Sequence, residues 1–123
     1  MTASLEEYLK VIYILLKIKG IARVTDIAEE LGVKKPSVNR ALKILKEEGF
    51  IYYEAYKDIE LTDKGIICAK DIVRKQDTLK AFLVEVLSVD DKKAETEAKL
   101  MKHAISEDTV NKLESYIQSI IDV

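Results

Sequence analysis

A set of polar and basic residues between positions 35 and 43 has side chains suited to contacting a nucleic acid. An arginine such as Arg40 can donate two parallel hydrogen bonds to O6 and N7 of guanine, and an asparagine such as Asn39 can pair with adenine in a similar way. Lysines supply positive charge for phosphate groups. We therefore predict that this set contacts DNA. Its members are Lys35, Ser37, Asn39, Arg40 and Lys43.

An apolar stripe marks the helix that must position these side chains. Its spacing of i, i+3, i+4 and i+7 is typical of an amphipathic helix. Pro36 fits the first turn, where a missing N–H costs little, and Gly49 is expected to end the helix. The polar set falls on the opposite face, which is also what an ordinary solvated helix face predicts. The stripe consists of Val38, Ala41, Leu42 and Leu45.

Two further helices are predicted before this one. A capping box that begins at Ser4 opens the first, which ends near Gly20. Thr25 is expected to cap a short second helix that stops at Gly32. The tight turn between the second and third helices is typical of a helix-turn-helix motif, whose last helix enters the major groove of DNA.

The period changes after Gly49. Residues 50–55 favour a strand, and residues 59–61 favour another, so we predict a hairpin with its turn near Lys57 and Asp58. A hairpin at this place forms the wing of a winged helix-turn-helix and lies along the DNA backbone. Tyr56 and Lys57 therefore join the predicted DNA contacts.

The rest of the chain predicts helices only. Thr62 or Asp63 caps a long helix that runs to about Leu87, and Ser106 opens the last of two more. The fold class is thus mainly α with a small β-hairpin. We expect a winged helix-turn-helix domain at 1–70 and a helical dimerisation domain at 71–123. Each of the last two helices has an apolar stripe, and a domain as small as residues 71–123 cannot bury both within its own core. A homodimer is therefore predicted.

Composition excludes several classes of protein. One cysteine and one histidine among 123 residues cannot build a disulfide scaffold, a zinc module or a catalytic cluster, so no enzyme is expected. The sequence has neither a secretory signal nor an apolar run long enough to span a membrane, which predicts a cytoplasmic protein. The net charge is −2, yet residues 32–57 carry six basic and three acidic side chains. This basic patch can meet phosphate.

Several motifs resemble the diphtheria toxin repressor family, in particular its short manganese transport regulator branch. The resemblance implies homodimers that bind palindromic operators on double-stranded DNA, near metal-uptake genes, when a manganese or iron ion is bound. The motifs are Glu6–Leu9, Ala22–Val33, Pro36–Val38, Tyr53–Tyr56, Leu61–Gly65 and His103–Ser106.

The metal ligands that the resemblance implies are mostly replaced. Of the aligned positions, only Glu7 and His103 carry conventional ligands. A lysine is protonated at neutral pH and has no lone pair to offer. We therefore predict no control by a conventional divalent metal site and no resident cofactor. The replaced positions are Lys10, Gln76, Lys99 and Lys102.

Two interpretations of the lysines stay open. Their ammonium groups can replace the metal by pairing with nearby acids, namely Glu6, Glu7, Asp77 or Glu95, or they can form a solvated surface. Gln76 lies on an apolar stripe and is expected to point inward, whereas positions 99, 102 and 103 are expected to share one helix face.

The main functional prediction is a homodimeric, sequence-specific DNA-binding transcriptional regulator, a repressor, without a conventional metal switch. The alternatives are a manganese- or iron-dependent repressor of metal-uptake genes and a winged-helix module that binds proteins instead of DNA.

Overall fold

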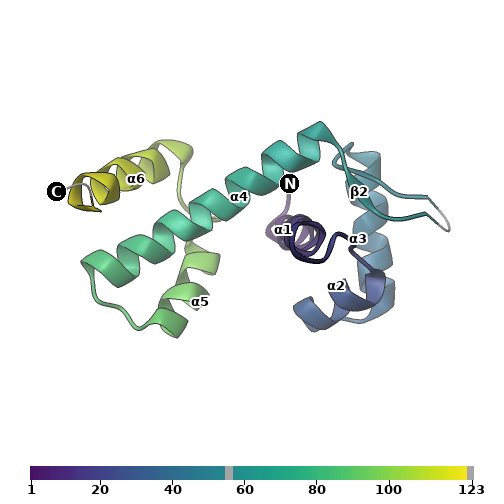
Figure 1. Ribbon diagram of the computed structural model, residues 1–123, viewed down its shortest axis with the longest axis horizontal. Coiled ribbons are helices and arrows are strands. Elements are labelled where there is room, and N and C mark those ends of the chain that lie inside the picture. Colours follow the sequence, from purple (N-terminus) through teal and green to yellow (C-terminus); the bar gives the residue numbers. More distant parts are fainter. Residues whose placement is uncertain (55–56, 122–123) are drawn as a thin grey trace. The chain divides into compact units, whose positions relative to one another are not determined.

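The computed structural model describes residues 1–54 and 57–121 of the chain (Figure 1). These residues form helices and one two-stranded antiparallel sheet, which confirms the predicted fold class. None of the helices formed by these residues is long and apolar enough to cross a membrane. The elements are α1 (Ala3–Lys19), α2 (Val24–Leu31), α3 (Lys35–Glu47), β1 (Ile51–Tyr52), β2 (Glu60–Leu61), α4 (Asp63–Ala81), the π-helical turn η1 (Phe82–Val86), α5 (Asp91–Met101) and α6 (Glu107–Ile121).

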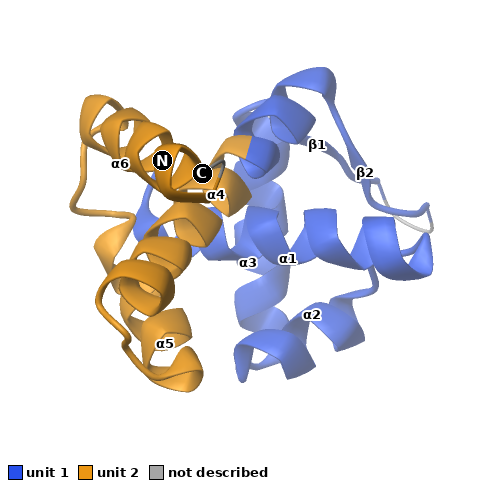
Figure 2. Cartoon of the chain, turned by 60° about the vertical axis from the view of Figure 1, so that its left-hand side comes forward, with its two compact units in different colours: residues 1–70 blue, residues 71–123 orange. Residues whose placement is uncertain are grey.

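The chain divides into two compact units, residues 1–70 and residues 71–123, coloured separately in Figure 2. In unit 1, helices α1, α2 and α3 pack on one another and bury aliphatic side chains between them. The apolar stripe predicted for α3 is buried, so the helix turns its polar face outward. The most deeply buried side chains of this core are Leu9, Ile12, Ile27, Val38, Leu42, Leu45 and Ile51.

The turn between α2 and α3 depends on Gly32. Its φ of 62° lies in the left-handed region, which glycine adopts without steric cost. The Gly32 N–H donates to the last carbonyls of α2, and the Val33 N–H donates to the Ala28 carbonyl at 3.0 Å. This closure ends α2 and leads the chain directly into α3, where Pro36 occupies the first turn as predicted.

The wing is closed against the start of α4 by Thr62. Its hydroxyl lies 2.7 Å from the Gly49 carbonyl, to which it donates, and accepts from the Gly65 N–H at 3.0 Å. Strands β1 and β2 pair with Ile51 opposite Leu61 and Tyr52 opposite Glu60. Of the two predicted caps of α4, Thr62 is therefore the one that binds a first-turn N–H.

Unit 2 has a small core of its own. Leu79 and Leu83 pack against Ala94 and Ala98 of α5, and the methyl-sized side chains of α5 let the two helices approach closely. Arg74 of α4 holds α6 by ion pairs to Glu107 and, at 2.8 Å, to Glu114. The hydrogen bond that Arg74 donates to the Glu114 carboxylate is the main reason why the pKa of Arg74 is raised above its usual value.

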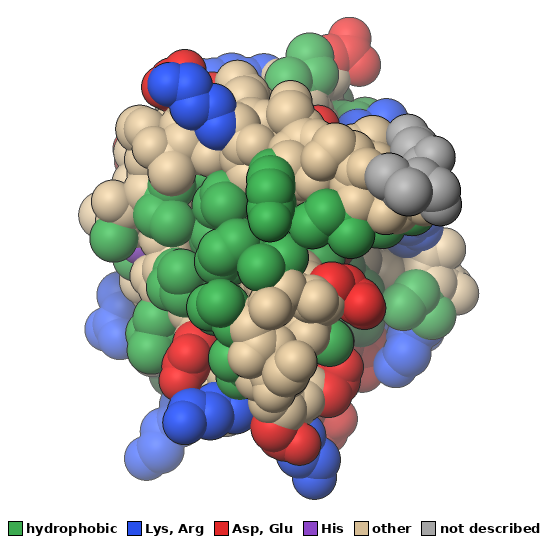
Figure 3. Space-filling view, turned by 90° about the vertical axis from the view of Figure 1, so that its left-hand side faces the viewer, with side chains coloured by type: hydrophobic (Ala, Val, Ile, Leu, Met, Phe, Trp, Pro, Cys, Tyr) green, Lys and Arg blue, Asp and Glu red, His purple; other side chains and the backbone are tan. Residues whose placement is uncertain are grey.

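One face of unit 2 keeps large apolar side chains in contact with water. Figure 3 views the molecule from the side on which α6 lies in Figure 1, and hydrophobic side chains gather there. Isolated exposed apolar residues are common, but a cluster of them is typical of an interaction surface. The large apolar side chains exposed in unit 2 are Leu87, Leu100, Tyr116, Ile120 and Ile121.

Two predicted caps are wrong by two residues each. Helix α1 is capped by Thr2, whose hydroxyl accepts from the Leu5 N–H at 3.2 Å, so Ser4 lies inside the first turn. Helix α2 begins at Val24 after an extended Arg23, which offers no side-chain cap, so Thr25 also lies inside. Ser106 does cap α6, since its hydroxyl accepts from the Thr109 N–H at 3.2 Å.

The long helix ends differently from the prediction. Regular α-helix stops at Ala81, and the last turn widens into η1, where the Leu87 N–H donates to the Phe82 carbonyl five residues back. Ser88 then takes a left-handed φ of 57°, and the Val89 N–H closes on the Leu83 carbonyl at 2.9 Å. Hydrophobic periodicity cannot distinguish such a widened turn from a regular one.

We expect Gly65→Ala to destabilise unit 1. A Cβ at this position would lie 2.0 Å from the Phe50 carbonyl oxygen, so the backbone of the wing would have to shift. The cost should be about 1–3 kcal/mol of unfolding free energy, more than the ~1 kcal/mol that alanine gains in a helix.

Urea unfolding followed by circular dichroism measures this free energy. Ile67→Ala serves as the control, because Ile67 is exposed on the same helix. Equal stability of Gly65→Ala and the unmodified chain would contradict the close packing described above.

Candidate nucleic-acid interface and the metal-site positions

The predicted DNA contacts of α3 lie together on its solvent face. Lys35, Asn39, Arg40 and Lys43 are exposed, and Ser37 is half-buried near the start of the helix. The Arg40 guanidinium donates to the Ser37 hydroxyl at 3.3 Å, which leaves further N–H groups on the same planar fork. The helix therefore presents both bidentate donors and point charges from one face.

The surroundings of this face favour an anion. The first turn of α3 contains no acidic residue, and the positive end of the helix dipole lies there. Lys34 and Lys46 are exposed on the same element or directly beside it. Phosphate groups near the start of α3 would meet backbone N–H groups as well as lysines.

The wing contributes less charge than the sequence predicted. Lys57 is exposed, and its ammonium lies 3.1 Å from a carboxylate oxygen of Glu54. This exposed pair offsets part of the charge that Lys57 was expected to offer to phosphate. Tyr56, the other predicted contact of the wing, lies outside the described residues.

Lys64 is a structural residue that the sequence analysis missed. Its ammonium donates to the Glu48 carbonyl at 2.8 Å and lies 4.4 Å from the centre of the Phe50 ring. Lys64 thus satisfies a carbonyl at the end of α3 from the first turn of α4. Sixteen residues separate donor and acceptor, so no local pattern could have indicated the contact.

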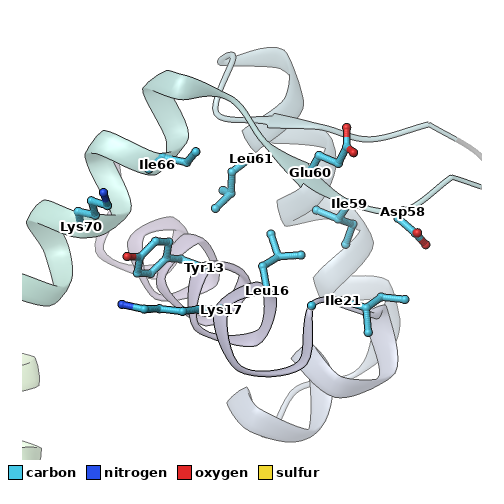
Figure 4. Close-up of a pocket in the computed structure, with 11 residues that line it drawn as sticks. Tyr13, Leu16, Lys17, Ile21, Asp58, Ile59, Glu60, Leu61, Ile66 and Lys70 are labelled. Carbon is cyan, nitrogen blue, oxygen red and sulfur yellow. The ribbon is translucent and has the colours of Figure 1, made fainter.

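Unit 1 also contains an open hollow of about 800 Å³, bounded by α1, β2 and α4 (Figure 4). Lys17, Lys70 and the Tyr13 hydroxyl lie toward one end, and Asp58 and Glu60 lie toward the other, with aliphatic side chains between them. Helix α3 does not line this hollow, so it is separate from the predicted DNA face.

The metal-site positions of unit 1 pair with each other. The Lys10 ammonium lies 2.9 Å from a Glu7 carboxylate oxygen, and the two side chains are 10% and 17% exposed. This pair is one of the internal salt bridges considered from the sequence. Burial of Lys10 contradicts the solvated-surface interpretation at this position.

The metal-site positions of unit 2 include a second buried lysine. Lys102 is 5% exposed, and its ammonium donates to the Gln76 side-chain oxygen at 2.7 Å. The Gln76 amide in turn donates to a Glu95 carboxylate oxygen at 2.8 Å. Gln76 points inward as predicted, and Lys102, like Lys10, is not part of a solvated surface.

The other two positions of this group are exposed. Lys99 and His103 lie at the surface, whereas Lys102 between them is buried. Lys102 is the C-cap of α5 and has helical φ and ψ, and its N–H donates to the Ala98 carbonyl at 3.1 Å, so it continues the helical phase of Lys99. That positions 99, 102 and 103 share one helix face stays a prediction.

These residues do not fit a divalent metal. Manganese and iron prefer carboxylate and imidazole ligands, and the six positions offer only Glu7 and His103. Gln76 has one more neutral oxygen, but the Lys102 ammonium already occupies it. Among residues 1–54 and 57–121, no group of three or more His, Cys, Asp or Glu side chains is placed to hold a metal ion.

Arg74 is the centre of a cluster of ion pairs that the sequence analysis did not single out. A signal was present, because its partners Glu107 and Glu114 are seven residues apart and therefore lie on one face of α6. Lys75 adds a contact to Glu107 at 2.9 Å, and this hydrogen bond is the main cause of its raised pKa. The cluster joins α4 to α6 and is a structural clamp.

Comparisons with protein families match the two parts of the chain separately. Residues 1–59 match the N-terminal DNA-binding domain of iron-dependent repressors, and residues 62–120 match the metal-binding and dimerisation domain of the same family. An uncharacterised helix-turn-helix transcriptional regulator of Methanocaldococcus jannaschii is 37% identical over 99% of this chain and 98% of its own length. The regulator MntR of Bacillus subtilis is 33% identical over 95% of this chain and 82% of its own length.

Solved structures give the same result. The manganese regulator SloR superposes with a TM-score of 0.84 at 30% identity, over 96% of this chain and 55% of that one. The metal-dependent transcriptional regulator MtsR superposes with a TM-score of 0.87 at 26% identity, also over 96% and 55%. This chain thus spans about half the length of these two relatives. The resemblance to the diphtheria toxin repressor family is confirmed, and the chain belongs to the iron-dependent repressor family of DNA-binding, dimerising transcriptional regulators.

Proposed function

We propose that this protein is a homodimeric repressor that binds a palindromic operator in double-stranded DNA. In each protomer the winged helix-turn-helix domain, residues 1–70, places α3 in the major groove, and residues 71–123 join the two protomers. A two-fold dimer presents two copies of α3, which is why a palindrome is the matching operator. No enzymatic activity is part of this proposal.

The observation that supports it most is the solvent face of α3. Asn39, Arg40 and Lys43 are exposed there together, on a helix whose opposite face forms the core of a matched DNA-binding domain. A winged-helix module that binds proteins is the weaker alternative, since such a module has no need of a bidentate base donor beside phosphate-binding lysines.

The proposal includes control without a conventional divalent metal site. The donor set supports this, because Lys10 and Lys102 are buried among the positions where the resemblance implies metal ligands. The competing candidate is a manganese- or iron-dependent repressor, which the family description and the metal-dependent relatives favour. Operator binding with and without metal separates the two candidates.

Arg40→Ala should weaken operator binding by roughly 1–3 kcal/mol per half-site and relax preference at one base pair, because it removes the bidentate donor. Fluorescence anisotropy with labelled operator and with random DNA, at two salt concentrations, measures both effects. Lys57→Ala should weaken binding slightly and to the same extent for all DNA sequences, since Lys57 is already paired with Glu54.

Lys92→Ala is the matched control, because Lys92 is exposed on α5 in the other unit. If Arg40→Ala lowered the affinity for operator and for random DNA equally, Arg40 would be a phosphate contact. Binding to no DNA at either salt concentration would favour the protein-interaction module.

The unmodified protein should bind its operator equally well, within about twofold, in chelator and in manganese, since two conventional ligands are too few for a regulatory site. The fourfold variant Lys10→Glu, Gln76→His, Lys99→Glu, Lys102→Glu should make binding metal-dependent. The measurement is anisotropy with EDTA and with manganese chloride. Loss of binding by the unmodified protein in EDTA would decide for the metal-dependent repressor.

Ile120→Glu should weaken the dimer, because a carboxylate in an apolar interface loses water without gaining a partner. Sedimentation velocity at micromolar concentration should show the unmodified chain at twice its own mass and the variant shifted toward the monomer. Asn111→Glu is the control, since nine residues place position 111 half a turn away on α6. A dimer unaffected by Ile120→Glu would exclude this face.

A further inference from the structure

Lys102 is unusual because its charged end is buried. The residue is 5% exposed, and it lies directly after the last turn of α5. Lysine usually keeps its ammonium in water even when its aliphatic stem packs against protein. Burying the charge is costly unless oxygen atoms replace the lost water. The contacts of Lys102 therefore indicate what the burial achieves.

Those contacts form a chain of charged and polar groups between α4 and α5. The Lys102 ammonium donates to the Gln76 oxygen at 2.7 Å, and the Gln76 amide donates to Glu95 at 2.8 Å. The other Glu95 oxygen lies 2.8 Å from the ammonium of Lys80. Gln76 and Lys80 are one turn apart on α4, whereas Glu95 and Lys102 come from α5 and its end. The chain thus crosses between the two elements three times.

We infer that the Lys102 ammonium is the built-in cation of this domain, which fastens the end of α5 to α4 through Gln76 and Glu95. The inference rests on the proposed metal-independent function. The matching family domain is described as metal-binding. In this chain, a lysine side chain would supply the positive charge that a bound metal ion supplies in such a domain.

The chemistry of the group supports this role. An ammonium carries one positive charge and three donors, so it can hold a neutral amide oxygen in a fixed orientation. Because the Gln76 oxygen faces Lys102, its NH₂ group must face Glu95, and the whole chain has one consistent direction. A divalent ion brought next to this ammonium would be repelled, most strongly in a buried place.

A cation that is part of the chain also differs from a metal in occupancy. It is present in every folded molecule, and it does not depend on the metal concentration around the protein. Unit 2 would therefore hold α5 against α4 at all times. This is the arrangement expected of a regulator whose DNA affinity does not follow a metal ion.

The competing explanation is that Lys102 only fills space with its aliphatic stem. Lys102→Met has nearly the same shape without the charge, and Lys102→Arg keeps the charge. If the charge matters, Lys102→Met should lower the melting temperature of the full chain by roughly 5 °C or more, since it leaves a buried acceptor without its donor. Lys102→Arg should lose less than half of that. Lys93→Met, an exposed lysine on α5, is the control and should change nothing.

A double-mutant cycle isolates the pair. Gln76→Leu should also lower the melting temperature, but in the Lys102→Met background it should lower it much less, because the contact is already gone. Thermal unfolding is followed by circular dichroism in EDTA and again with manganese chloride. The loss caused by Lys102→Met should be the same in both buffers, and operator affinity should fall at least fivefold in parallel.

Equal stability of Lys102→Met and the unmodified chain would overturn the inference, and so would equal losses in Lys102→Met and Lys102→Arg, which would indicate packing alone. Additive effects in the cycle would also overturn it. These outcomes are distinct from failure of the proposed function. Operator binding by the unmodified protein tests that function, whereas melting temperatures in EDTA test the role of Lys102 whether or not DNA is bound.

Discussion

The close approach of the Phe50 and Gly65 backbones is the constraint on which unit 1 depends most. Only a residue without a Cβ fits there, and the Thr62 hydroxyl fixes the same place by joining the Gly49 carbonyl to the Gly65 N–H. The end of α3, the first strand of the wing and the first turn of α4 therefore meet at one point. Lys64 adds a hydrogen bond to the Glu48 carbonyl. These contacts fix the end of α3, and with it the helix whose polar face is exposed to solvent.

Lysine has two opposite roles in this chain. On α3 the ammonium groups of Lys35 and Lys43 stay in water, where their charge is available to a polyanion and is screened by salt. Lys10 and Lys102 are buried, and the ammonium of each lies close to a neighbouring side-chain oxygen, at 2.9 and 2.7 Å. Composition alone cannot separate these roles. A net charge of −2 thus includes both the basic solvent face of α3 and internal cations.

Much of the fold could be predicted because its signals are local. Gly32 and Pro36 mark a helix end and a helix start whatever surrounds them, and the stripe of α3 identifies its buried face. Gln76 was expected to point inward from its place in a hydrophobic pattern, and it does. The site positions in α3 follow from the same pattern, since the polar face must be the one left over.

The features that the sequence did not indicate depend on contacts between distant residues. The burial of Lys102 accompanies its contact with Gln76, which lies 26 residues away in the sequence. The widened turn η1 and the left-handed Ser88 have no residue signature, because glycine is the usual residue at such a helix end. The caps Thr2 and Arg23 precede the predicted ones by two residues, within the usual uncertainty of helix ends.

Helix α4 runs from Asp63 to Ala81, and the boundary between the two units falls inside it, after Lys70. The chain therefore passes from one unit to the other within regular helix. Each residue of an α-helix advances the chain by about 1.5 Å and turns it by about 100°. Inserting or deleting one residue within α4 would thus turn the side chains that follow by about 100° around the helix axis relative to those before. The exposed positions of α4 can accept changes of residue type far more easily than this helix can accept a change of length.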